Sequence, residues 1–255
     1  MNTYNRILLI LCGMSSVMLT GCSENDFEAF EDPGATSVTT NPAVISQKNF
    51  SILASDWAPQ VINPDDGSFT QTEVTLTVFT GDRNNQTVTD GHTIAFISEY
   101  GLINPPTCVT GADGTCSVTW SAIKPPDEDG PGSDYRVTIT VYTTGEETFT
   151  DTNGNGLFDD GDDGFEDLEE PYVDADWYEI NNDGISTDGN NIFSAGDTII
   201  DVVSTNDPTG INGLHDAGDG FFNGLGCTHS SLCATLPSVM IWDDIVLYID
   251  GPPTP

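Results

Sequence analysis

An imbalance of charge constrains this chain more than any other feature of its sequence. The chain holds 41 Asp and Glu residues against five Lys and Arg, for a formal net charge of −36, and no Lys or Arg follows Arg136. Carboxylates repel one another in a compact state unless cations neutralise them. A polyanion also repels nucleic acid, because binding there depends on neutralising phosphates. We therefore expect no nucleic-acid partner, and we expect bound divalent cations.

The N-terminal residues have the layout of a signal peptide. Arg6 supplies a charged start, and the apolar run over 7–19 is too short to span a bilayer comfortably. The run ends in Leu19-Thr-Gly-Cys22, which resembles a bacterial lipobox. That resemblance implies cleavage after residue 21 and acylation of Cys22; the alternative is an ordinary signal peptide with a chance cysteine. By analogy with lipoprotein sorting, Ser23 favours the outer membrane, where acyl chains would anchor the protein.

The cysteines outside this leader segment and its lipidation site form two closely spaced pairs. An exported protein folds in an oxidising compartment, so we expect two local disulfides, Cys108–Cys116 and Cys227–Cys233. The first bridge would clamp a hairpin between its cysteines. His229 lies within the second pair, so a zinc site is the alternative there, although a fourth ligand is not evident.

Composition divides the chain into five segments. These are a signal peptide (1–21), a flexible acidic tether (22–48), a strand-rich region (49–145), an acidic insertion (146–235), and a final strand with its tail (236–255).

The strand-rich region alternates apolar and polar residues in short runs separated by Asp-Gly and Pro-Pro turn signals. The runs cover 74–78, 93–98, 116–120 and 137–141. Short alternating strands at this spacing favour an all-β fold, an antiparallel β-sandwich.

Two motifs in this region carry a resemblance. An Asp-Gly turn leads into Thr93-Ile-Ala-Phe96, and Thr110 to Val118 reads T-x-x-D-G-x-x-x-V. The region is similar to bacterial Ig-like domains of the invasin/intimin type, which implies an Ig-like sandwich and an adhesive role. The two cysteines and the long acidic segment that follows depart from that pattern.

The end of the chain reads as one more strand, over 238–250. We expect it to return and complete the sandwich, which would make the acidic segment an insertion before the last strand. The Asp243-Asp244 step shifts the apolar alternation and predicts a β-bulge.

The acidic insertion contains a twelve-residue calcium-loop pattern. Calcium takes six to eight hard oxygens, and alternate residues of a tight loop can all point inward. Gly156 at position 6 makes the sharp turn, and Leu157 at position 7 offers its carbonyl. The predicted ligands are Asp151, Asn153, Asn155, Leu157, Asp159 and Asp162.

The second half of this loop recurs twice in degenerate form, as an N-G-x-x-D-x-G-D unit. A middle copy supplies Asp188, Asn190 and Asp197 as predicted ligands, and a third copy supplies Asn212, Asp216 and Asp219. In the third copy Pro208 occupies the first ligand position, and the neighbouring Asp207 could substitute for it. The cluster over 179–184 offers another register for the middle site.

These units, with the link Glu170-Pro-Tyr-Val-Asp174, resemble the EF-hand-like calcium-loop arrays of secreted bacterial proteins. The resemblance implies Ca²⁺ as the bound ion. The flanks lack amphipathic helical patterns, so paired helix–loop–helix units are not expected. The alternative is a solvated acidic linker rich in Asn-Gly turns.

We expect a non-enzymatic function, because the sequence contains no nucleophile elbow, no H-E-x-x-H motif and no P-loop. The prediction is an exported calcium-binding surface lipoprotein with a structural or adhesive role and a protein or glycan partner. The alternatives are a carbohydrate-binding module, which exposed Trp57 or Trp177 would favour, and an accessory subunit of a surface polysaccharide or appendage assembly.

Overall fold

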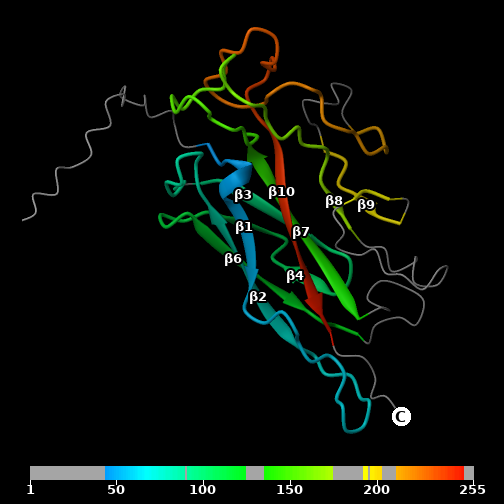
Figure 1. Cartoon of the computed structure of the whole chain (residues 1–255). Coiled ribbons are helices and arrows are strands. Elements are labelled where there is room, and N and C mark those ends of the chain that lie inside the picture. The colour runs from blue at the N-terminus through cyan, green and yellow to red at the C-terminus, as the bar shows by residue number, and fades with distance from the viewer. Residues whose placement is uncertain are drawn as a thin grey trace, which may run out of the picture. The chain divides into compact units, whose positions relative to one another are not determined.

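The computed structural model describes residues 44–89, 91–124, 135–174, 192–194, 196–202 and 211–249 (Figure 1). The predicted signal peptide, Cys22 and most of the predicted tether lie outside these ranges. In the part of the chain that is described, no helix has the length and apolar character needed to cross a membrane.

Two four-stranded antiparallel sheets form the fold. The first has the order β1-β2-β6-β4, and its strands are β1 (Phe50–Ala54), β2 (Glu73–Thr80), β6 (Thr115–Ser121) and β4 (Leu102–Asn104). The second has the order β10-β7-β3-β5, and its strands are β10 (Val239–Tyr248), β7 (Arg136–Gly145), β3 (Thr93–Ser98) and β5 (Thr107–Val109). A 3-10 turn, η1 (Gln47–Asn49), precedes β1.

Alternation in the sequence becomes alternation in burial, because successive strand side chains point to opposite faces. Val74, Leu76 and Val78 of β2 are buried, whereas the residues between them face outward. On the neighbouring strand β6, Trp120 pairs with Val74 and is fully buried. The inward residues of both sheets join one apolar core, so the sheets pack face to face.

The prediction of an all-β fold is confirmed, and β10 lies in the second sheet as the edge strand beside β7 (Figure 1). The predicted bulge is wrong: the pairing from Val239↔Gly145 to Tyr248↔Arg136 runs without interruption. Asp243 shares a strand face with the buried Ile241 and Leu247, and its Oδ2 accepts a hydrogen bond from the Ile52 backbone N–H at 3.1 Å. Asp243 therefore fits on the inward face of β10 without a bulge, because a backbone N–H of β1 supplies a polar partner across the sandwich.

The order of the strands corresponds to that of an immunoglobulin sandwich if β1, β2, β6 and β4 stand for A, B, E and D, and β3, β7 and β10 for C, F and G. One feature departs from that scheme. The chain enters the first sheet at β4 and then returns to the second at β5, before it reaches β6. Membership of the invasin/intimin type remains a prediction.

Cys108 and Cys116 are bonded to each other, but the bridge does not clamp a two-stranded hairpin as predicted. Cys108 lies on β5, which pairs with β3, and Cys116 lies on β6, which pairs with β2. The disulfide therefore joins the two sheets. Sequence spacing could not distinguish the two arrangements, because both need only a short connecting turn.

The predicted tether ends too late. Ile45 is fully buried in the sandwich core, and Ser46 forms a bridge with Glu146. The side chain of Gln47 exchanges hydrogen bonds with the backbone of Trp242 on β10, at 2.8 and 3.1 Å. The fold thus begins by residue 45, ahead of the boundary predicted at 48.

A short ribbon of the insertion covers the outer face of the second sheet. It consists of β8 (Tyr172–Val173) and β9 (Thr198–Ile199). Val173 packs with Ile97 and Tyr142 of the sheet, and the Thr140 hydroxyl donates to the Tyr172 carbonyl at 2.8 Å. This cover explains why β7 is buried on both faces, with a nearly continuous run of buried residues.

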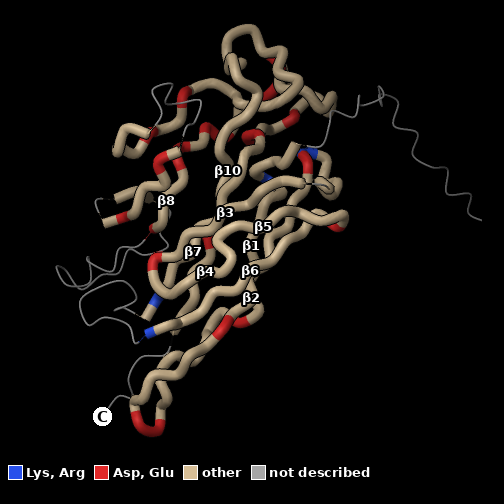
Figure 2. The backbone as a smooth tube through the Cα atoms, turned by 180° about the vertical axis from the view of Figure 1, so that it is seen from behind, with Lys and Arg blue, Asp and Glu red and all other residues tan. Residues whose placement is uncertain are grey.

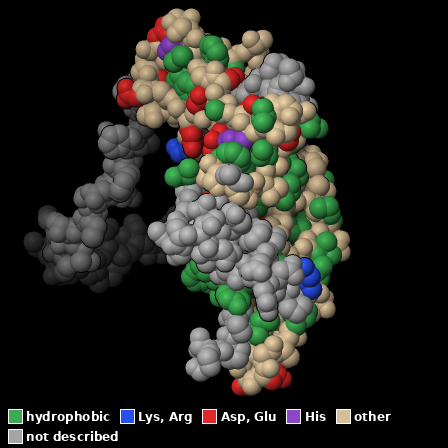
Figure 3. Space-filling model, turned by 90° about the vertical axis from the view of Figure 1, so that its right-hand side faces the viewer, with side chains coloured by type: hydrophobic (Ala, Val, Ile, Leu, Met, Phe, Trp, Pro, Cys, Tyr) green, Lys and Arg blue, Asp and Glu red, His purple; other side chains and the backbone are tan. Residues whose placement is uncertain are grey.

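The carboxylates are unevenly distributed. Figure 2 shows Asp and Glu concentrated in the segments around β8 and in the loops beyond the sheets, with few on the strands. Figure 3 shows carboxylate side chains and histidines gathered over the same end of the molecule. The insertion is therefore the part of the molecule where a cation site is expected.

Candidate metal centre

The first predicted loop folds around Asp151. Its carboxylate accepts backbone hydrogen bonds from Gly154 (2.8 Å), Asn155 (3.2 Å) and Gly156 (2.8 Å). Gly154 and Gly156 have φ of +72° and +75°, a left-handed conformation that glycine adopts without strain. The chain therefore wraps tightly around the first predicted ligand.

The other predicted side chains converge on the same loop. The amide nitrogens of Asn153 and Asn155 donate to Asp159, at 3.0 and 2.6 Å for the shortest pairs. Asp162 closes the loop: its Oδ2 accepts from the Asp159 N–H and its Oδ1 from the Thr152 N–H, both at 2.9 Å. Hydrogen bonds from the Gly161 backbone, and then from the two Asn side chains, lower the pKa of Asp159 and keep it ionised.

An aromatic cluster packs around Phe158 of this loop. Phe158, at position 8, is 1% exposed, and its ring centroid lies 5.6 Å from Phe149, 5.5 Å from Phe165 and 4.8 Å from Phe222. Ring pairs at these separations stabilise one another beyond the area they bury. Phe158 thus anchors a polar loop that has little apolar content of its own.

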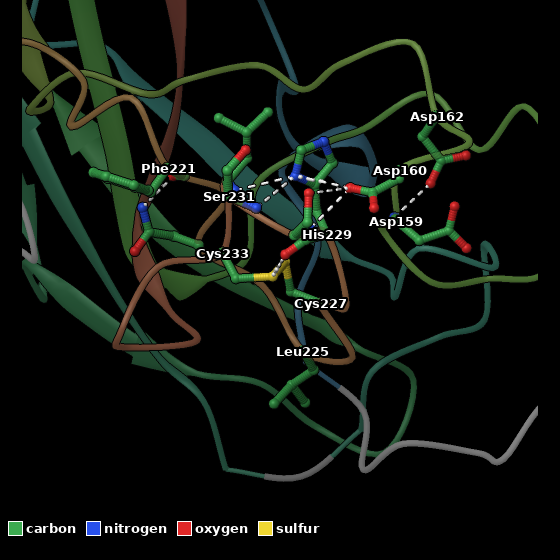
Figure 4. The surroundings of a disulfide bond; sticks show 12 residues. Asp159, Asp160, Asp162, Phe221, Leu225, Cys227, His229, Ser231 and Cys233 are labelled. Carbon is green, nitrogen blue, oxygen red and sulfur yellow. Dashed lines mark hydrogen bonds and ion pairs between the residues drawn. A yellow bond between two sulfur atoms is a disulfide. The ribbon is translucent and has the colours of Figure 1, made fainter.

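The second disulfide, Cys227–Cys233, closes a short loop that carries His229 (Figure 4). His229 stacks on Phe158 with centroids 5.2 Å apart, and its Nδ1 lies 3.5 Å from Asp160. The Phe158 carbonyl accepts from the backbone N–H of residues 228 and 229. The bonded sulfurs leave no thiolate for the alternative zinc site, and His229 serves as a packing residue.

The third predicted loop retains its centre. The Asn212 Oδ1 accepts from Leu214 N–H at 2.6 Å, and its Nδ2 donates to Asp216 at 3.3 Å. The Asp216 N–H donates to Glu170 at 3.2 Å. Asp219 accepts from the Phe221 N–H at 2.7 Å, and its role as a ligand stays a prediction.

The middle loop is described only at its end. Asp197 accepts a hydrogen bond from the Ser194 backbone N–H at 2.6 Å, which repeats the closure of position 9 by position 12 seen in the first loop. Asp188 and Asn190, the alternative cluster over 179–184 and Asp207 lie outside the described residues.

Two buried carboxylates that sequence reasoning missed lie where the insertion leaves the sandwich. Glu146 forms a two-pronged ion pair with Arg83, which also donates to the carbonyls of Gly156 (3.0 Å) and Leu225 (2.7 Å). Glu147 is 1% exposed and accepts from two backbone N–H groups, at 2.9 and 2.7 Å. Burial raises the pKa of Glu147 to about 7. The sequence shows Glu146-Glu147 but not what surrounds them.

In the described ranges, no three or more His, Cys, Asp or Glu side chains already lie together in an arrangement that could hold a metal ion. The predicted donor sets also use amide and carbonyl oxygens, as calcium sites commonly do. In the first loop the amide nitrogens of Asn153 and Asn155 face Asp159, so both amides must turn before their oxygens can bind a cation.

No protein-family model, curated protein or solved structure matches the chain.

Proposed function

We propose that this chain is an exported lipoprotein that binds calcium through its acidic insertion and serves a structural or adhesive role at the outer membrane. The first loop carries the proposal. Left-handed glycines wrap the chain around Asp151, the amides of Asn153 and Asn155 contact Asp159, and Asp162 closes the loop through the Asp159 N–H. The lipid anchor rests on the sequence Leu19 to Cys22, outside the described residues.

Calcium would act by ordering and neutralising the insertion. Asp151, Asp159 and Asp162 place three carboxylates in one loop, and no lysine or arginine side chain from the insertion is available, since none follows Arg136. A divalent ion relieves their repulsion and ties positions 1, 9 and 12 together. A protein or glycan partner would then meet a rigid surface supported by the sandwich.

The test is thermal unfolding of the full chain, disulfides intact, in a chelator and then in a few millimolar calcium. Extracellular calcium sites bind at about 10⁻⁴–10⁻³ M, so an occupied site stabilises by about 1–2 kcal/mol. A gain of that size raises the Tm by about 2–8 °C. Asp151→Ala/Asp162→Ala should remove the first loop's share of the shift.

The matched control is Asp65→Ala/Asp66→Ala, which removes the same charge from a turn of the sandwich between β1 and β2. This variant should keep the whole calcium shift. A wild-type Tm that calcium leaves unchanged would reduce the insertion to an acidic linker and overturn the proposal.

One observation supports carbohydrate binding as a second candidate function. Trp57 is 67% exposed and stands edge-on to Tyr248, with ring centroids 6.4 Å apart. The guanidinium carbon of Arg136 lies over the Tyr248 ring, 5.8 Å from the ring centroid. Exposed aromatic rings can stack on sugars. Glycan-array binding that disappears in Trp57→Ala, with an unchanged Tm, would support this function, and an array with no binding would remove it. Trp177, the other predicted contact, lies outside the described residues.

A further inference from the structure

The hydrogen bonds of the third loop repeat those of the first, with partners from elsewhere in the chain. At position 6 of the first loop, the Gly156 N–H donates to Asp151 at 2.8 Å. At the corresponding place in the third loop, the Gly213 N–H donates to Asp201 at 2.5 Å. In the third loop Pro208 occupies position 1 and has no side-chain oxygen. Asp201, twelve residues before Gly213, accepts this hydrogen bond in place of a position-1 residue.

The closing contact is repeated in the same way. In the first loop the Asp159 N–H donates to Asp162, and in the third the Asp216 N–H donates to Glu170 at 3.2 Å. Glu170 lies 46 residues before Asp216 and directly ahead of strand β8. The Asp216 carbonyl also accepts from the Glu170 N–H at 2.9 Å, which fixes the two segments side by side.

The centre of the loop follows the same pattern. Asn212 receives the Leu214 N–H and faces Asp216, as Asn155 receives the N–H of residue 157 and faces Asp159. The position-8 residue is again aromatic and packed. His215 stacks on a phenylalanine of the middle loop with centroids 3.9 Å apart, as Phe158 packs in the first aromatic cluster.

Two of these carboxylates leave an oxygen buried and unsatisfied. Glu170 is 2% exposed, and its Oε1 has no hydrogen-bond partner among the described residues, while its Oε2 accepts from Asp216. The Oδ1 of Asp201 is likewise buried, with no partner in the part of the chain that the structure describes. Buried carboxylate oxygens left in this state need a cation or a proton.

We propose that Asp201, Asn212, Asp216 and Glu170, with the Leu214 carbonyl, form a second calcium site that is closed by Glu170 rather than Asp219. This inference rests on the proposed function, since it assumes that the insertion binds calcium. A glutamate at the closing position can bind through both oxygens, as the usual twelfth residue of a calcium loop does. Binding draws the three carboxylates together and turns the Asn212 amide toward the ion.

Such a site would join parts of the insertion that are distant in sequence. Glu170 leads into β8, Asp201 follows β9, and Asn212 to Asp216 belongs to the segment that leads toward β10. The Val173–Ile200 cluster already packs this ribbon against the second sheet. Calcium at this point would therefore fasten the ribbon onto the sandwich, whereas calcium in the first loop orders one loop alone.

The experiment counts calcium ions bound to the full chain by equilibrium dialysis and native mass spectrometry. Glu170→Gln and Asp201→Asn should each lose one ion, or weaken one site at least tenfold, and the control Asp219→Asn should lose none. Asp162→Asn should lose a different ion. Glu170→Gln keeps the size of the side chain. A Tm in chelator equal to that of wild type shows that this variant is folded. If Glu170→Gln does not fold, the ion count of Asp201→Asn tests the site.

Terbium(III) supplies a local readout, because it occupies calcium sites and luminesces when a nearby tyrosine or tryptophan is excited. Tyr172 lies 5.4 Å from His215 and 5.0 Å from Trp242, measured between ring centroids, whereas the aromatic rings packed around the first loop are phenylalanine and histidine. Terbium emission should disappear in Glu170→Gln and persist in Asp162→Asn.

The outcomes separate the two proposals. A wild-type chain that binds no calcium contradicts the proposed function and this inference together. A chain that binds calcium, but loses the same ion in Asp219→Asn and not in Glu170→Gln, leaves the proposed function standing and overturns the assignment of Glu170. Equal ion counts with equal affinities in wild type, Glu170→Gln and Asp201→Asn also overturn it.

Discussion

The sandwich and the insertion satisfy their backbone groups in opposite ways. In the sandwich, strands such as β2 and β6 pair along seven consecutive positions, and the side chains are free to form an apolar core. In the insertion, the described strands are two residues long, and carboxylates accept many of the backbone N–H groups. Glu147, for example, receives the N–H groups of Leu168 and Asn223 while it is almost fully buried.

The two regions therefore owe their stability to different forces. An apolar core depends on burial, which added cations and pH affect little. A region held by carboxylates depends on their charge state and on counter-ions, because desolvated like charges oppose folding. The sandwich should therefore tolerate chelators and changes of pH that loosen the insertion.

Arg83 supplies a polar contact between the two regions, in addition to the packing of the β8–β9 ribbon on the second sheet. It lies in the sandwich between β2 and β3, and its guanidinium contacts Glu146, Gly156 and Leu225 of the insertion. It also lies 5.2 Å from the Phe149 ring centroid. A planar guanidinium with several fixed donors suits such a junction better than a lysine.

The largest expected effect comes from removing the centre of the sandwich. Trp120 is fully buried, and its indole N–H donates to the Tyr100 carbonyl at 2.8 Å. Trp120→Ala should lower the free energy of unfolding by about 3–5 kcal/mol, through lost burial and a cavity. Chemical denaturation would measure the loss, and hydrogen exchange should show it along β2 and β6.

Phe158→Ala is the matched variant in the insertion. It deletes a ring that is 1% exposed, but its loss should increase exchange in residues 149–165 and 222–233 while β2 and β6 keep their protection. Uniform loss of exchange protection in both regions, in either variant, would show that the sandwich and the insertion unfold as one unit. The two regions would then not differ in the source of their stability.

An intermediate effect is expected at the junction. Arg83→Met leaves Glu146, which is 2% exposed, buried without its cation. Removing one partner of a buried ion pair costs about 3–5 kcal/mol, reduced here because 17% of the Arg83 side chain is exposed. Thermal unfolding should show the loss. The double variant Arg83→Met/Glu146→Gln should recover part of it, and a double variant no better than the single one would contradict a role for buried charge.

The smallest expected effect tests pH dependence. Burial, followed by the charges of Asp243 and Asp174, raises the pKa of Asp244 from 3.8 to about 6. A folded state that holds this proton more tightly than the unfolded chain loses stability as pH rises from about 4 to about 6. Asp244→Asn should reduce that loss by about 1–2 kcal/mol, since each pH unit in the window is worth at most about 1.4 kcal/mol.

Urea titrations of wild type and Asp244→Asn at several pH values, in chelator, would measure this effect. Asp66→Asn serves as control, because hydrogen bonds from Ser68 lower the pKa of this exposed carboxyl. The free energy of unfolding of Asp66→Asn should therefore fall between pH 4 and 6 as steeply as that of wild type. Superimposable profiles for wild type and Asp244→Asn would show that the region around β10 does not discriminate against charge.

Much of the sandwich could be predicted because its signals are local. The pattern over 93–98 is β3 itself, and the other alternating runs each fall within a strand. The short strands β4 and β5 were missed, since three residues are too few for a period to be recognised. The bulge was wrongly predicted because Asp243 finds its partner, the Ile52 N–H, on a strand that is distant in sequence.

The path of the first loop, the all-β class and both cysteine pairings follow from local sequence, because each depends on residues within a few positions of one another. Three features could be seen only in the folded chain: Cys108–Cys116 joins two sheets, Arg83 contacts the insertion, and Glu170 lies beside Asp216. Each of these contacts brings together atoms from separate segments. Spacing along the chain limits which nearby residues can touch one another. Which distant residues come into contact depends on how the β8–β9 ribbon packs on the second sheet.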